Sequence, residues 1–269
     1  MQVYQPQITG NFFLEAALMH VANYSAINKF GHAPDCDSGV DTDIWDGADG
    51  VTSTDIWVAP TAARIHAIVS SDVNDTAAGT GAQSVEVFGL IDWDNGFTTH
   101  ETIVLNGTTP VNTVNPYVIV HRLQVHDTGS GGTNAGIIKA TAAVDSTITA
   151  LIRIGNRQTQ MAIYGVPTNF LFAITAIHSS VDANSSANIL GKLLVKVHAD
   201  TATGGFAVKR QWTFRRDSRI DLTYAPPFVI EGPAIVKIQV TSDTANVAVN
   251  AHFDGIIHEK KFPSEHVDT

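Results

Sequence analysis

Apolar and polar residues alternate in many short runs of this chain, and this period of two restricts the folds that it can adopt. The runs "QSVEVFGLI" at 83–91 and "NPYVIVHRLQV" at 115–125 are clear examples, and "AIVKIQV" at 234–240 repeats the pattern. Alternation in segments rich in Val, Ile, Thr and Phe predicts strands that bury one face. A helical pattern is confined to "NFFLEAALMHVAN" at 11–23, where Asn11 is suited to cap the helix.

Turn-forming residues separate these runs at short intervals. Examples are "NDTAAGTGA" at 74–82, "DTGSGGTNAG" at 127–136 and "DTATGG" at 200–205. Many short strands joined by tight turns predict an all-β fold. We expect an antiparallel β-sandwich or jelly-roll-like architecture, as one large or two small β domains. An N-terminal arm that carries a short helix precedes it.

The patterns divide the chain into four predicted segments. Residues 1–50 lack strong periodicity and are interpreted as an N-terminal arm, able to lie on a neighbouring subunit, and an acidic connector. A break near "RIGNRQ" at 153–158 separates a first β unit, 51–155, from a second, 156–260. The polar residues that follow are expected to form a flexible tail over 261–269.

The composition argues against several classes of binding partner. Charged residues make up 16% of the 269 residues, well below the roughly 25% usual in soluble domains. The net charge of −10 disfavours binding to phosphate backbones and to anionic membranes. The single cysteine, Cys36, excludes an internal disulfide and a cysteine-based zinc site. No signal peptide or membrane-spanning apolar run is evident, so we expect synthesis in the cytoplasm.

Six aspartates crowd the stretch "NKFGHAPDCDSGVDTDIWDGADG" at 28–50. Packed carboxylates suggest calcium, and the weak candidates are Asp41, Asp43 and Asp46. The twelve-residue EF-hand pattern requires an oxygen ligand at its fifth position. A loop begun at Asp41 places Trp45 there. Calcium therefore stays a minor hypothesis for this stretch.

The alternative interpretation of the same stretch is a turn-rich connector between the arm and the first strand. In a connector of this kind, the apolar side chains Phe30, Ile44 and Trp45 are expected to be its anchors. Its aspartates are expected to accept hydrogen bonds from nearby backbone amides, as Asp commonly does in turns.

Searches for catalytic motifs give no positive result. The eleven histidines do not fall at metal-ligand spacing, and no G-x-S-x-G nucleophile elbow is present. The glycine-rich "SGGTNAG" at 130–136 lacks the Lys-Ser/Thr ending of a phosphate loop. We therefore predict a protein that is not an enzyme and needs no cofactor. Glycosidase chemistry by two distant carboxylates stays open, and its candidates are Glu15, Glu86, Glu101, Glu231, Glu259 and Glu265.

Four stretches between Asn28 and Ala140 carry a resemblance to a known family. They are "NKFGHAPDCDSG", "NDTAAGTGAQSVEVFGL", "THETIVLNGTTPVNT" and "TGSGGTNAGIIKA", followed by the looser "QTQMAIYGVPTNFLFAI" and "FDGII". Together they resemble a family of tailed-bacteriophage virion structural proteins. That family commonly has Arg after Lys-Phe-Gly, whereas His32 stands there in this chain.

The resemblance implies a place in the virion, with the major capsid protein or other virion proteins as partners. We expect a non-enzymatic protein that decorates or cements the capsid as a homo-oligomer, with a trimer as the natural guess. One alternative is a neck, tail or fibre component. Another is a carbohydrate-binding β-sandwich that contacts the host surface, with Trp45, Trp57 and Trp93 as exposed ring platforms.

Overall fold

The structure is a computed structural model that describes residues 12–18, 20–50, 54–94, 98–181, 186–201, 204–215 and 218–260. Within these residues the fold is all-β, as predicted, and neighbouring strands in every sheet run antiparallel. The described part contains one helix, α1 (Phe12–Ala17). It has no helix with the length and apolarity that crossing a bilayer requires. The predicted tail at 261–269 and the Asn11 cap lie outside the described residues.

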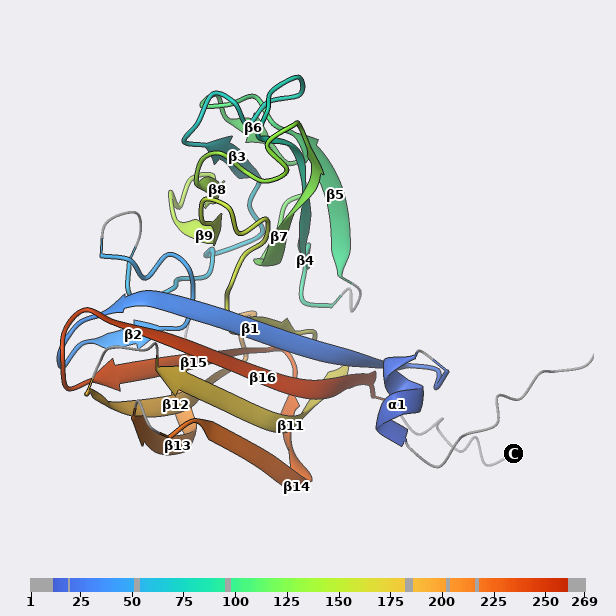
Figure 1. The fold of residues 1–269 in the computed structure, drawn as a ribbon. Coiled ribbons are helices and arrows are strands. Elements are labelled where there is room, and N and C mark those ends of the chain that lie inside the picture. The colour runs from blue at the N-terminus through green and yellow to red at the C-terminus, as the bar shows by residue number, and fades with distance from the viewer. Residues whose placement is uncertain are drawn as a thin grey trace, which may run out of the picture.

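Two sheets build the lower half of the molecule in Figure 1, which we call the base unit. The first sheet has the strand order β1 (Tyr24–Cys36), β16 (Val247–Glu259), β11 (Phe170–Val181) and β14 (Ile220–Glu231). The second has the order β10 (Ile163–Val166), β15 (Ala234–Ser242), β12 (Asn188–Val197) and β13 (Ala207–Arg215), and β2 (Asp41–Asp43) also pairs with β15. The two sheets are in contact, since the Tyr164 ring of the second lies 5.5 Å from the Phe172 ring of the first.

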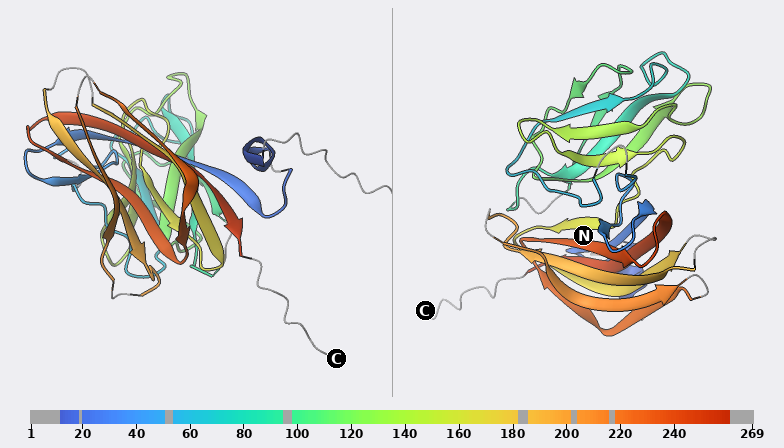
Figure 2. Two further views of the ribbon diagram at one scale, coloured as in Figure 1. Left: turned by 90° about the horizontal axis from the view of Figure 1, so that it is seen from below. Right: turned by 90° about the vertical axis from the view of Figure 1, so that its left-hand side faces the viewer.

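Two smaller sheets form the upper half, which we call the inserted unit because its strands all lie between β2 and β10 in the chain (Figure 1 and Figure 2, right). One sheet has the order β6 (Val111–Asn112), β3 (His66–Ser70), β8 (Ile138–Ala142) and β9 (Ile148–Ile152). The other has the order β5 (Thr99–Val104), β4 (Ala82–Leu90) and β7 (Ile119–Thr128). The predicted break at 153–158 falls between β9 and β10.

The interpretation of residues 1–50 as an arm and a connector is wrong for residues 24–36. They form the 13-residue strand β1, which pairs along its length with β16. The alternation is hidden in the sequence because two inward positions hold Lys29 and Gly31 rather than large apolar residues. Lys29 is buried at 7% exposure. A Cβ on Gly31 would lie 2.5 Å from backbone atoms of Ile44 and Ala162, so close packing requires glycine there.

The helix is shorter than the sequence predicts. α1 covers six residues, and Asn23, with φ of 67°, then turns the chain into β1. The Phe12 ring packs edge-on against Tyr24 at 5.1 Å, and Tyr24 stacks on His258 at 4.9 Å. In Figure 1 α1 lies beyond the ends of β1 and β16, at one end of the base unit. These ring contacts hold the helix, since six residues are too few for a stable isolated helix.

Candidate functional site

Asp43, one of the three calcium candidates, is the buried centre of a network that joins β2 to β15. Its carboxylate accepts hydrogen bonds from Lys237 Nζ at 2.5 Å, Gln239 Nε2 at 3.0 Å and the Trp57 amide at 2.8 Å. The side chains of Asp43 and Lys237 are 0% and 2% exposed. The prediction of a local cap is therefore wrong for Asp43, because two of its partners lie on a strand almost 200 residues away.

The other two candidates have separate partners. Asp41 accepts from Lys192 Nζ at 2.7 Å and Thr241 Oγ1 at 2.5 Å. Asp46 accepts from the Gln160 amide at 2.9 Å, and burial raises the pKa of its carboxyl to about 7. Among the described residues, the three aspartates do not come together within the reach of one ion. Each carboxylate therefore has its own partners: Asp43 and Asp41 both bind β15, and Asp46 binds the chain just before β10.

The predicted connector anchors divide into two groups. Ile44 and Trp45 are buried at 0% and 1% exposure, and Trp45 Nε1 donates to the Thr54 carbonyl at 3.1 Å. A Cβ on Gly47 would meet the Trp45 ring at 2.3 Å, which explains the glycine in "WDG". Phe30, in contrast, is 39% exposed on the outer face of β1, so it does not anchor the connector.

Buried polar contacts join the base unit to the inserted unit. Lys29 Nζ on β1 donates to the His121 carbonyl on β7 at 2.6 Å, and Trp57 Nε1 donates to the Thr149 carbonyl on β9 at 2.8 Å. Burial, and then the nearby Arg122 charge, lower the pKa of Lys29 to about 7. The His121 ring also stacks on Tyr164 of β10 at 4.7 Å. The two units therefore meet through specific side chains.

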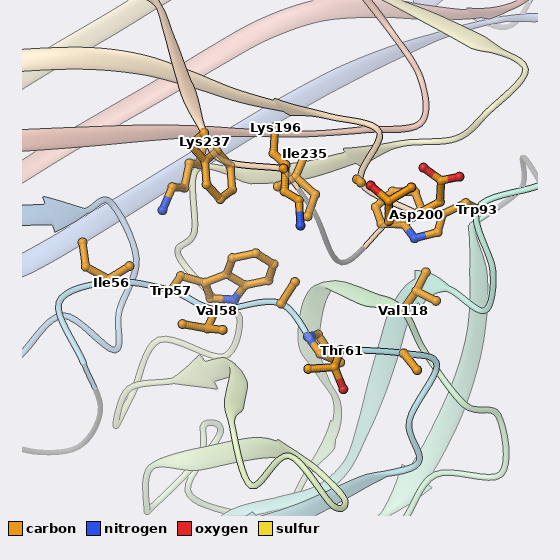
Figure 3. A pocket seen from close by; sticks show the side chains of 17 residues that line it. Ile56, Trp57, Val58, Thr61, Trp93, Val118, Lys196, Asp200, Ile235 and Lys237 are labelled. Carbon is orange, nitrogen blue, oxygen red and sulfur yellow. The ribbon is translucent and has the colours of Figure 1, made fainter.

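A cavity of about 490 Å³ lies along this junction. Residues from both units line it, including Trp57, Trp93, Lys196, Asp200 and Lys237. Figure 3 shows Trp57 across the cavity from Lys196 and Ile235. Lys237 Nζ lies 4.3 Å from the centre of the Phe206 ring, a cation–π contact that places its charge in the cavity wall.

The tryptophans expected to be exposed platforms are arranged differently. Trp45 is buried in the connector, and Trp57 is 2% exposed in the cavity wall. Trp93 is half-buried and lines the same cavity. An exposed platform of three rings is therefore ruled out by the burial of Trp45 and Trp57.

Asp75 organises the glycine-rich loops of the inserted unit. Its buried carboxylate accepts from Ser70 Oγ at 2.5 Å and from the amides of Ala82, Ala135 and Gly136 at 2.7, 2.8 and 2.9 Å. Two of these amides belong to the "TNAG" loop. Because they already bind a carboxylate of the protein, the loop is not arranged as a phosphate cradle.

Glu101, a candidate for glycosidase chemistry, is also engaged in structure. Its carboxylate accepts from the Val114 amide at 2.7 Å, the Asn115 amide at 3.0 Å and Tyr117 Oη at 2.9 Å. Of the other candidates, Glu15 contacts His20 and Glu231 contacts Lys260. Glu265 lies outside the described residues. The carboxylates of Glu101, Glu15 and Glu231 are therefore each bound to another group of the protein.

Sequence reasoning missed one cluster of chemically capable side chains. His178 on β11 and His252 on β16 lie directly opposite each other, with Asp254 two residues further along β16. Alternation places His252 and Asp254 on one face, but the strand pairing that adds His178 is not visible in the sequence.

No protein-family model, curated protein or solved structure matches the chain in the comparisons made with it.

Proposed function

We propose that the chain is a non-enzymatic virion structural protein of a tailed phage that decorates or cements the capsid shell. In this proposal it is made in the host cytoplasm and assembles as a homo-oligomer, with a trimer as the preferred state. Its partners are the major capsid protein or other virion proteins, and not nucleic acid or a membrane. Support comes from the resemblance of 28–140 to such proteins, the antiparallel sheets and the low charged fraction of 16%.

The proposal includes a finer description of the fold. The contact between the two base sheets through Tyr164 and Phe172 favours a β-sandwich, in which two sheets pack face to face. A jelly-roll-like connection of its strands is part of the same proposal. A rigid sandwich suits a protein that must bear mechanical load, because its long strands share many backbone hydrogen bonds.

The observation that carries the proposal is the apolar surface of α1. Phe12, Leu14 and Leu18 are 43%, 46% and 53% exposed on and just after this short helix. Leu14 and Leu18 are four residues apart and so lie on one side of the helix, and exposed apolar patches mark interaction sites. In our proposal this end of the base unit contacts the shell or a neighbouring copy, and the inserted unit projects outward.

Particle stability tests the cement role. Particles lacking the protein are mixed with the wild type or with the double variant Leu14→Glu and Leu18→Glu, and their disruption temperature is measured. The wild type should raise that temperature by mass action, because it binds the assembled shell and not loose subunits. The double variant should not raise it. Val114→Glu, at another exposed apolar position (82%), is the matched control and should behave as the wild type does.

Unchanged disruption temperatures with all three proteins would contradict the cement role. If the protein binds only at the tail or neck, the alternative of a neck, tail or fibre component gains support. Its position on labelled particles, over the whole shell or at one vertex, distinguishes these two proposals.

The second candidate is carbohydrate binding, favoured by the cavity of about 490 Å³ that Trp93 lines together with Thr61 and Asp200. A half-buried indole beside polar groups is a suitable surface for a sugar ring. A glycan screen of the isolated protein tests this candidate, with Trp93→Ala as the matched variant. Glycan binding that Trp93→Ala abolishes supports it, and no binding by the wild type contradicts it.

A further inference from the structure

The outer face of the first base sheet carries a row of side chains that crosses all four strands. The register places Phe30 of β1, His252 of β16, His178 of β11 and Asp221 of β14 side by side in this order. The two imidazole rings stack with their centres 4.3 Å apart. Asp254 lies on the same face of β16 as His252, two residues along. This face is half-buried at His178, His252 and Asp254.

The ligand atoms of His178, His252 and Asp254 lie close enough to share an ion. One atom from each lies within 4.8 Å of the other two, and His178 Nε2 is 3.9 Å from Asp254 Oδ2. A tetrahedral zinc ion with bonds of about 2.0–2.1 Å separates its ligands by roughly 3.3 Å. To bind one ion, the two rings, now stacked at an interplanar angle of 19°, would have to turn so that a nitrogen of each points at the same place.

Neighbouring side chains already orient two of the three ligands. His178 Nδ1 lies 2.7 Å from Asp221 Oδ1, and a carboxylate accepts a proton donor at that nitrogen. In the neutral ring, the lone pair of His178 then lies on Nε2, the nitrogen 3.9 Å from Asp254 Oδ2. Asn28 Nδ2 donates to Asp254 Oδ1 at 2.8 Å, which leaves Oδ2 for an ion. Metal sites use contacts of this kind to fix the tautomer and the direction of their ligands.

We propose that His178, His252 and Asp254 bind one divalent ion of the zinc class, with its fourth position open to water. Two imidazoles and one carboxylate suit Zn²⁺ better than Ca²⁺ or Mg²⁺, which prefer oxygen ligands throughout. The ligands come from the central strands β11 and β16, and the orienting Asp221 and Asn28 come from the edge strands β14 and β1. The ion would therefore tie together all four strands of the sheet. This site does not depend on the proposed virion function.

Zinc titration of the full-length, tag-free, EDTA-treated protein tests the site. Calorimetry should show one Zn²⁺ per chain, and Co²⁺ should give the visible absorption of a tetrahedral complex at the same stoichiometry. His178→Ala, His252→Ala and Asp254→Ala should each weaken Zn²⁺ binding by at least about tenfold, because each removes a ligand. Asp221→Asn should weaken it by about 10- to 100-fold, the usual cost of losing an orienting partner.

The matched control is His100→Ala. The wild-type His100 ring stacks on Phe88 in the inserted unit, so its loss should leave the affinity for Zn²⁺ unchanged. A Zn²⁺ concentration that saturates the wild type should raise the melting temperature of the wild type and of His100→Ala, and should raise that of His252→Ala by less. His178→Gln, which keeps a polar side chain of similar length, replaces the alanine variant if that variant does not fold. Two results would overturn the proposal. One is the absence of zinc binding by the wild type. The other is zinc binding that the ligand variants do not weaken. In that case zinc binds adventitiously to other surface histidines, and the cluster is held by His–Asp pairing alone.

Discussion

The base unit and the inserted unit satisfy their buried polar groups in different ways. The base unit combines β1 and β2 with strands that begin more than 100 residues later, and a buried ion pair between Asp43 and Lys237 fixes that long-range contact. The inserted unit is continuous in the chain, and its buried Asp75 and half-buried Glu101 carboxylates accept hydrogen bonds from backbone amides of its own loops. The base unit therefore depends on an ion pair between segments far apart in the chain, and the inserted unit on carboxylates that bind its own loops.

The largest expected effect comes from breaking the ion pair of the base unit. Asp43→Asn leaves the Lys237 ammonium buried at 2% exposure without its counter-charge. Removing one partner of a buried pair lowers the free energy of unfolding by about 3–5 kcal/mol. Urea unfolding of the purified protein measures the change. The double variant Asp43→Asn and Lys237→Met should recover part of the loss. A loss below about 1 kcal/mol in the single variant would be typical of an exposed pair and would contradict a structural role for this pair.

The next effect should be confined to the inserted unit. Asp75→Ala leaves the Ser70 hydroxyl and three amides without their acceptor. Each buried group left unpaired costs roughly 1–3 kcal/mol. Because water can replace the carboxylate for part of them, we expect the free energy of unfolding to fall by about 2–4 kcal/mol in total. Hydrogen exchange should accelerate in 74–82 and 127–136 and stay slow in β11 and β16. Asp72→Ala, which removes a local contact to Asn74, is the control with a smaller effect. Equal acceleration in both units would show that they unfold as one.

Parts of the fold and of the candidate sites could be predicted from the sequence, and others could not. The alternating runs correctly indicated strands such as β4 and β7, and the all-β class followed from them. The sequence also identified Ile44 and Trp45 as candidate anchors, and both are buried. It could not reveal β1, because Lys29 and Gly31 occupy inward positions that usually hold apolar residues. Nor could it pair His178 with His252, which requires the register of β11 against β16.

The junction between the two units should respond to pH through Lys29. Its pKa is about 7 in the folded protein against 10.5 for the free side chain, so between these values the unfolded chain binds the extra proton. Stability should therefore rise with pH from about 7 toward 10, at no more than about 1.4 kcal/mol per pH unit. Lys29→Met should lack this component. The test is the difference in unfolding free energy between the two proteins at several pH values. A difference that does not change with pH would contradict the lowered pKa.

The smallest effect is expected at an ion pair near the surface of the inserted unit, whose Arg64 and Asp145 side chains are 26% and 11% exposed. Arg64 Nε contacts Asp145 Oδ2 at 3.0 Å, and the bonds from Arg64 and Thr61 lower the pKa of Asp145 to about 2. Pairs at the surface are screened by water and contribute little. Asp145→Asn should leave the melting temperature near that of the wild type at neutral pH. A clear drop would mean that surface charges stabilise the inserted unit as its buried carboxylates do.

A cryo-EM map of the native particle tests the central proposal most directly. Our account predicts repeated copies over the capsid shell, with the base unit and α1 against the coat and the inserted unit projecting outward. Density for the protein only at the neck or tail, or copies attached through the inserted unit, would contradict it.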